Sequence, residues 1–273
     1  MKNLLLLFTP LLLLFACQNT PKNTSEHTPK QEIPVDTIAF FEDFKEKERC
    51  INQNKDTLCA KGSALVINIE NGPNDTATGK IRAQLQKEIS GDSINISEYL
   101  DNFILGVDYY LEEENEYWPP YYAIDVVQDV ALNNRFLLTG TTHQHTEEGG
   151  AHGNYFSQNF NFDIKTGENL DWRDLFVDSL QVYKLAEKTL QTELQKEEDI
   201  EISLYEFYDF PEDRFYLPDN FLIDEHSFSF LYTVYEIGPY VQGETEIVLP
   251  FQEIKFLVKE EAVLADYLKT IEF

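Results

Sequence analysis

Basic residues are scarce in this chain. Its 273 residues include 21 Lys and Arg against 49 Asp and Glu, which gives a formal net charge of −28 at pH 7. Nucleic-acid binding and electrostatic attachment to anionic lipid both need Lys and Arg to neutralise phosphates, so we expect neither. A strongly negative surface attracts basic proteins and cations, which leaves a cationic partner open.

Several catalytic and nucleotide-binding motifs are also missing. The chain has no phosphate-binding P-loop, no dinucleotide-binding glycine fingerprint and no G-x-S-x-G nucleophile turn. Hydrophobic residues nevertheless make up 42% of the chain, enough to build a core, so a fully disordered protein is excluded. We therefore expect a folded protein with no catalytic residues, no cofactor and no metal that the sequence identifies.

Only three cysteines are present, and the first ends the one long hydrophobic run. Leu4 to Ala16 is an apolar run of 13 residues, shorter than the roughly 20 residues that a transmembrane helix needs. Lys2 before the run and a small residue at its end are typical of a secretory signal. The sequence Leu14-Phe15-Ala16-Cys17 resembles the lipobox of bacterial lipoproteins. This resemblance implies cleavage before Cys17 and acylation of that cysteine; the alternative is an ordinary signal peptide with a nearby cysteine.

The lipobox also indicates where the protein lies. We expect residues 1–16 to be the signal peptide and residues 17–37, which are rich in Asn, Thr, Pro, Lys and Glu, to form a disordered tether. Several acyl chains would hold the folded part firmly at a membrane. The expected location is the cell envelope, outside the cytoplasm, with membrane contact only through the lipid anchor.

Cys50 and Cys59 remain as a pair. An even pair in an exported protein favours a disulfide, which here would close the polar turn from Ile51 to Leu58. Half of a metal site is the alternative, but no further Cys or His lies within about twenty residues to complete it. We expect the disulfide.

Hydrophobic periodicity predicts mixed strands and helices. Alternating residues predict strands, and spacings of three and four predict helices, with Ser97 as one helix cap. The strand at 154–164 has one apolar face and one polar face, as in a sheet covered on one side. The expected strands are 62–70, 124–145 as a hairpin, 154–164, 227–235 and 244–249, and the expected helices are about 78–90, 97–114 and 179–195.

The order of these elements favours an α+β fold rather than strict β-α-β alternation. We expect two small mixed subdomains with antiparallel sheets packed by helices. The first would cover residues 38–165 and the second residues 166–273.

Three histidines lie close together in sequence. His143 and His145 share one strand face and could share a metal, but polar neighbours make a solvated strand end the better interpretation. His152 stands in the glycine-rich segment Glu148-Gly149-Gly150-Ala151-His152-Gly153, where the backbone needs unusual φ angles or close approach. A catalytic histidine needs a nucleophile and an orienting acid. We instead expect His152 to bond neighbouring backbone and fix the turn.

A second distinctive segment runs from Tyr235 to Gly243. Gly238-Pro239 predicts a turn, and Tyr235 and Tyr240 flank it. Tyrosines on a rigid loop are good binding anchors, although they are also ordinary packing residues.

Taken in order, these segments resemble one family. The quoted motifs are Gly149-Gly150-Ala151-His152, Phe162-Asp163-x-x-Thr166-Gly167, Asp171-x-x-Asp174-Leu175-Phe176, Tyr235-Glu236-Ile237-Gly238-Pro239-Tyr240-x-x-Gly243 and Leu249-Pro250-Phe251. The series is similar to the extracytoplasmic domain pair of unknown function in the lysozyme-sensing anti-sigma-V factor, which also precedes the catalytic domain of a peptidoglycan deacetylase. The resemblance covers about residues 38–258. It implies an α+β envelope module and, from the anti-sigma member, binding of a basic protein. We expect neither a sigma-binding segment nor a deacetylase domain beside the module.

We therefore expect a lipid-anchored, non-enzymatic binding module. Its partner would be a basic envelope protein such as lysozyme, or peptidoglycan. The alternatives are an envelope glycan-modifying enzyme that uses His152, or a structural subunit of an envelope complex. The expected contact residues are Tyr235, Glu236, Gly238, Pro239, Tyr240 and Gly243, with Gly149, Gly150 and His152 nearby.

Overall fold

A computed structural model describes residues 36–53, 56–90, 95–108, 121–198 and 201–273. The signal peptide, Cys17 and nearly all of the expected tether lie outside the described residues. Among the helices that are described, none has both the length and the apolar character needed to cross a membrane.

The first half of the described chain forms a five-stranded sheet in the order β1-β2-β3-β4-β5. Its strands are β1 (Ala39–Gln53), β2 (Asp56–Asn71), β3 (Tyr122–Asn133), β4 (Leu137–Glu148) and β5 (Asn154–Asp163). All neighbours are antiparallel except β2 and β3. Because parallel neighbours need a crossover connection, two helices join them.

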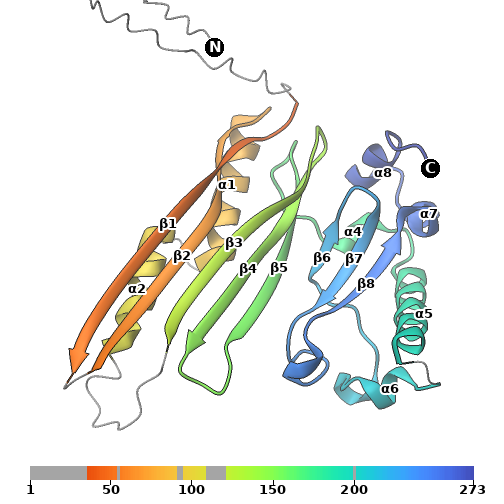
Figure 1. Cartoon of the computed structure of the whole chain (residues 1–273). Coiled ribbons are helices and arrows are strands. Elements are labelled where there is room, and N and C mark those ends of the chain that lie inside the picture. The colour runs from red at the N-terminus through yellow and green to blue at the C-terminus, as the bar shows by residue number, and fades with distance from the viewer. Residues whose placement is uncertain (1–35, 54–55, 91–94, 109–120, 199–200) are drawn as a thin grey trace, which may run out of the picture. The chain divides into compact units, whose positions relative to one another are not determined.

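These helices are α1 (Asp75–Ser90) and α2 (Ile96–Leu105), and they lie behind the sheet in Figure 1. Ile81 and Leu85 of α1 pack with Phe160 and Phe162 of β5 in one buried cluster. The expected cap of the second helix was wrong: Asn95, not Ser97, accepts the backbone N–H of Glu98. The helix ends in a 3₁₀ turn, η1 (Gly106–Asp108), and the rest of the expected range lies outside the described residues.

The predicted disulfide is present. Cys50 and Cys59 are directly opposite each other on β1 and β2, with their Cα atoms 4.0 Å apart. The segment expected as a polar turn instead continues the strand pairing, because Ile51 still faces Leu58 and Asn52 faces Thr57.

The second half forms a three-stranded antiparallel sheet in the order β6-β7-β8 (Figure 1). Its strands are β6 (Phe221–Ile223), β7 (Ser227–Tyr232) and β8 (Thr245–Pro250), and η3 (Tyr240–Gln242) lies between the last two. Its helices are α4 (Trp172–Leu175), α5 (Ser179–Glu198), α6 (Leu204–Phe207), α7 (Phe251–Ile254) and α8 (Val263–Leu268). Short 3₁₀ turns, η2 (Pro211–Asp213) and η4 (Lys255–Leu257), complete it.

Asparagine side chains join the two sheets. Asn161 of β5 accepts the backbone N–H of Ile223 at 2.9 Å and donates to the carbonyl of Phe221 at 2.6 Å. Asn220 in turn accepts the backbone N–H of Asn159 and donates to the carbonyl of Ser157. The expectation of a solvated polar face on this strand was therefore wrong, because Asn161 is only 1% exposed.

The α+β prediction is confirmed: both sheets are dominated by antiparallel pairs and are packed by helices. The boundary between the two expected subdomains, at residues 165 and 166, stays a prediction.

Candidate functional site

The two distinctive segments of the sequence meet in the folded protein. Gly149–Gly153 forms the β4–β5 connection, and Tyr235–Gly243 lies between β7 and β8. The hydroxyl of Tyr235 lies 3.1 Å from Nε2 of His152. We call these two segments together the paired-loop surface.

Hydrogen bonds hold the imidazole of His152 in one orientation. Nδ1 lies 2.8 Å from the carbonyl oxygen of Gly153. Because a carbonyl only accepts, Nδ1 carries the proton, and in the neutral ring Nε2 accepts from the hydroxyl of Tyr235. The expectation that His152 bonds neighbouring backbone agrees with this geometry.

Aromatic rings surround the imidazole. Tyr240 stacks on His152 with ring centroids 3.8 Å apart. Tyr155 meets Tyr240 edge-on at 5.8 Å, and Tyr235 lies 5.6 Å from the same ring. Tyr235 remains 57% exposed and Val241 is 91% exposed, so the group presents apolar surface to solvent. Stacked rings fixed by hydrogen bonds are rigid anchors for a partner.

Left-handed backbone shapes both loops. Gly149 has φ +82° and Gly243 has φ +74°. The glycine-rich segment around His152 predicts such an unusual φ angle for the β4–β5 turn, where Gly149 lies. Tyr235 also has a positive φ, +69°, which is uncommon for a residue with a side chain. Gly150 and Pro239 are exposed, and Gly238 packs so close to Gln242 that a Cβ there would meet its Oε1.

Glu236 is bonded within the protein, and its expected role as a contact residue stays a prediction. Its carboxylate accepts the backbone N–H of Thr233 and the hydroxyl of Tyr216, each at 2.8 Å. Both oxygens are thus engaged by the protein itself and hold the turn in shape. Burial, reinforced by this hydrogen bond to Glu236, raises the pKa of Tyr216 well above its ordinary value.

A hydrogen-bond chain lies beside the paired-loop surface. Nδ1 of His143 is 2.9 Å from Oγ of Ser157, and that hydroxyl donates to Oε2 of Glu244 at 3.0 Å. The sequence did not single out Ser157 or Glu244. Burial raises the pKa of Tyr155, and the carboxylate of Glu244 adds to the effect.

The two histidines of β4 each lie near a carboxylate beside the paired-loop surface. His145 lies 3.5 Å from Oε1 of Glu147, and His143 lies 3.9 Å from Oδ2 of Asp129. In the part of the chain that the structure describes, three potential metal ligands converge only at Glu48, Cys50 and Cys59, and both sulfurs there form the disulfide.

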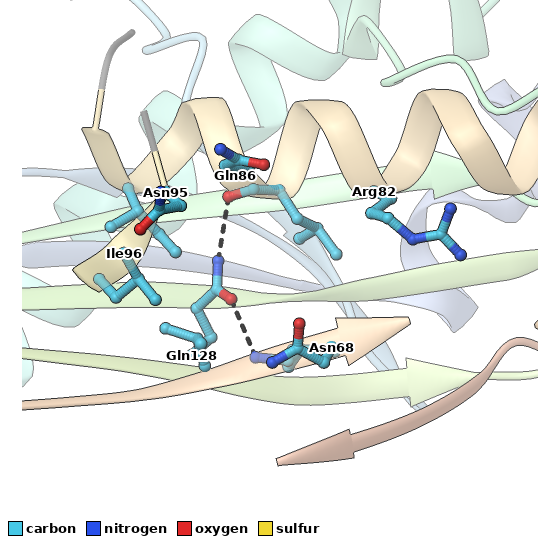
Figure 2. A pocket seen from close by; sticks show the side chains of 10 residues that line it. Asn68, Arg82, Gln86, Asn95, Ile96 and Gln128 are labelled. Atoms are coloured by element: carbon cyan, nitrogen blue, oxygen red, sulfur yellow. Dashed lines mark hydrogen bonds between the residues drawn. The ribbon is translucent and has the colours of Figure 1, made fainter. Parts of the chain in front are cut away.

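A separate cavity of about 160 Å³ lies between β2 and α1. Figure 2 shows Gln128 at its base, reaching the backbone of both elements. Its amide accepts the N–H of Ile67 and donates to the carbonyl of Leu85 and the hydroxyl of Thr142. Arg82 donates to the carbonyl of Ile69, so these polar groups serve the fold. The paired-loop surface remains the stronger candidate.

Comparison with known proteins gives one family match, which lies in the second half of the chain. Residues 173–252, which contain Tyr235–Gly243, match the family described as "Protein of unknown function (DUF3298)". No curated protein matches the chain. The expected resemblance to a domain of unknown function is confirmed at this level.

Two solved structures share the fold. A DUF3298 family member from Bacteroides fragilis has a TM-score of 0.69 and 16% identity, covering 86% of this chain and 100% of its own. A DUF3298 family protein from Pseudomonas aeruginosa has a TM-score of 0.57 and 14% identity, covering 82% of this chain and 96% of its own. At these identities the likeness concerns the fold alone.

Proposed function

We propose that this chain, with its DUF3298 domain, is a lipid-anchored envelope protein that binds a basic extracytoplasmic partner such as lysozyme. The observation that carries the proposal is the stack of His152 and Tyr240 beside the exposed Tyr235. The surface is fixed before any partner arrives, so binding loses little side-chain entropy there.

Charge supports a basic partner. The net charge of −28 attracts cationic proteins from a distance. At contact, Lys and Arg side chains bind favourably over tyrosine faces, and Glu147 and Glu244 near the surface add negative charge. Peptidoglycan is the second partner to test, because aromatic rings also pack against sugar faces.

The geometry favours binding over catalysis at His152. Its two ring nitrogens contact the carbonyl of Gly153 and the hydroxyl of Tyr235, and neither contact is an orienting acid. A general base of the usual kind is paired with a carboxylate and faces a nucleophile. An enzyme acting on envelope glycan and a structural subunit of an envelope complex remain the rival functions.

The direct test measures lysozyme binding to the immobilised folded domain at about 20 mM and about 500 mM salt, where the Debye length falls from roughly 20 Å to about 4 Å. We expect binding at low salt that weakens at high salt. Tyr240→Ala should lower the affinity at least about tenfold, because anchors of this kind dominate interfaces. Equal affinity at both salt concentrations, or no binding at either, would contradict the proposal of a basic partner.

Phe256→Ala is the matched control. Phe256 is 79% exposed and follows α7, so it lies beyond the end of β8 opposite to the paired-loop surface. This variant also removes an aromatic ring, one that is more exposed than Tyr240, and should leave the affinity unchanged. Equal losses in both variants would show that the paired-loop surface is not the contact.

The anchor and the rival enzyme need their own measurements. Cys17→Ala should move the protein from the membrane fraction to the soluble fraction, and unchanged fractionation would refute lipidation. Purified peptidoglycan should stay unmodified after incubation with the protein. Products that disappear with His152→Ala would replace the binding function with an enzymatic one.

A further inference from the structure

A cavity of about 360 Å³ lies at the other end of β4 from the paired-loop surface. Its lining includes Arg135 and Phe136 from the β3–β4 turn, Ile164 and Lys165 after β5, and Asn74 before α1. β4 runs from Leu137 to Glu148, so about 40 Å of extended strand separates the two places. The volume lies within the range of small-molecule sites.

Two cations line this cavity without an ion pair. Among the described residues, neither Arg135 nor Lys165 forms a salt bridge, although the chain has 49 carboxylate residues. The guanidinium of Arg135 lies over the ring of Phe136, 4.8 Å from its centroid. This stacking fixes the plane of the guanidinium and leaves its N–H groups available.

Both cations act on the same region of space. The pKa of Asp266 on α8 is lowered mainly by its hydrogen bond from Lys269, and Lys165 and Arg135 contribute to the same effect. Asp266 is already bonded to Lys269 at 2.8 Å. Asp266 and Lys269 together therefore add no net charge beside the two lining cations.

In the lining of the cavity itself, the cations outnumber the carboxylates. Asp163 accepts the backbone N–H groups of Lys165 and Thr166, so its carboxylate holds the turn after β5. Asp36 is the carboxylate in the lining itself. The lining itself therefore carries two positive charges against one negative charge, and Asp163, which keeps its charge, lies just outside it.

We propose that this cavity binds a small organic oxyanion, a carboxylate or a phosphate carried on an apolar body. Arg135 would take the oxyanion through two parallel N–H groups, which match the spacing of two oxygens. Lys165 would supply the second positive charge. Phe136 and the buried Ile164 offer the apolar floor against which the ligand body packs.

Calorimetry on the folded domain tests this with paired probes. N-acetylphenylalanine carries the carboxylate, its amide has nearly the same shape without the charge, and phenyl phosphate represents the other oxyanion. We expect at least one anionic probe to bind about tenfold or more tightly than the amide, because charge-assisted bonds to Arg and Lys are lost in the amide. The anionic probe that binds more tightly then shows whether the site prefers a carboxylate or a phosphate. Equal binding of anion and amide, or no binding of either anion at millimolar concentration, overturns the proposal.

Charge-neutralising variants locate the site. Arg135→Gln and Lys165→Gln should each weaken the preferred anion about tenfold. Lys87→Gln is the matched control, because Lys87 is exposed on α1, makes no ion pair in the described structure and does not line the cavity. Unchanged affinity in Arg135→Gln, or an equal loss in the control, overturns the assignment. Lysozyme binding should not change in Arg135→Gln, so this test is independent of the proposed function.

Discussion

The ring of Tyr240 stacks on the imidazole of His152 with an angle of 19° between the planes. This contact ties the β4–β5 turn of the first sheet to the β7–β8 connection of the second. Tyr235 reaches the same imidazole through its hydroxyl, so His152 positions both tyrosines. The histidine is therefore a positioning residue for the proposed contact surface.

Two substitutions of His152 should distinguish the contribution of its stacking from that of its hydrogen bond. His152→Ala removes both the stacking and the hydrogen bond, and we expect about tenfold weaker lysozyme binding with a change of less than about 1 kcal/mol in the free energy of unfolding, because the side chain is exposed. His152→Phe keeps a ring against Tyr240 and should retain most of the affinity. Surface plasmon resonance measures both. Full affinity in His152→Ala would show that the tyrosines need no positioning.

Asn161 should carry much of the attachment between the two sheets. Asn161→Ala leaves the N–H of Ile223 and the carbonyl of Phe221 without their partner in a buried place. Each unsatisfied group costs about 1–3 kcal/mol, so for two groups we expect a loss of about 2–6 kcal/mol in the free energy of unfolding. Urea denaturation followed by circular dichroism measures it. Asn154→Ala, at the exposed start of the same strand, is the control and should change stability by less than about 0.5 kcal/mol.

The strands with one apolar face could be predicted from the sequence, and the edge strand could not. Alternation predicted the β3–β4 hairpin and β5, because burial on one face imposes a period of two. β1 shows no alternation of apolar and polar residues. On this edge strand, Lys47 and Arg49 instead alternate with the acidic residues Glu46 and Glu48. Ion pairs of Lys47 with Asp101 and of Arg49 with Asp108 hold this strand to α2 and the turn after it. Such pairing depends on tertiary structure and leaves no periodic signal.

The parts of the candidate site that could be predicted are those that depend on residues close together in the sequence. The glycines and tyrosines of the two loops are visible in the sequence because unusual backbone and paired aromatics are local features. Ser157 and Glu244 are not, since their hydrogen bond joins a residue of β5 to one just before β8, far away in the sequence. The role of Glu236 was also hidden: its contact with Tyr216 depends on how the intervening chain folds.

Two glycines make a matched test of packing. A Cβ on Gly140 would lie 2.0 Å from the backbone oxygen of Asp129 and 2.5 Å from the ring of the buried Phe160. Because backbone cannot move aside cheaply, Gly140→Ala should lower the free energy of unfolding by about 2 kcal/mol or more. Gly79 on α1 has nothing within 4 Å of such a Cβ. Gly79→Ala should raise stability by about 0.5–1 kcal/mol, since alanine favours the helix. Thermal unfolding of both variants checks the pair, and similar Tm values would contradict it.

Stability should fall in alkaline solution because buried tyrosines must stay protonated. Burial raises the pKa of Tyr232 far above its ordinary value of about 10, and Tyr216 and Glu236 add to the effect. A group with a raised folded-state pKa stabilises the fold fully below its unfolded pKa, and this contribution is lost as the pH rises above about 10. Urea denaturation at pH 8 to 11.5 should therefore show a falling free energy of unfolding.

A variant isolates this tyrosine from the other groups that titrate in the same range. Tyr232 donates its hydroxyl to the carbonyl of Tyr216. Tyr232→Phe should lower stability at pH 8, because that buried carbonyl loses its donor, and should also flatten the alkaline decline, because one raised pKa is removed. Tyr121→Phe, at a half-exposed residue, is the control and should follow the wild-type curve. Parallel curves for wild type and Tyr232→Phe would assign the alkaline loss to groups outside this core.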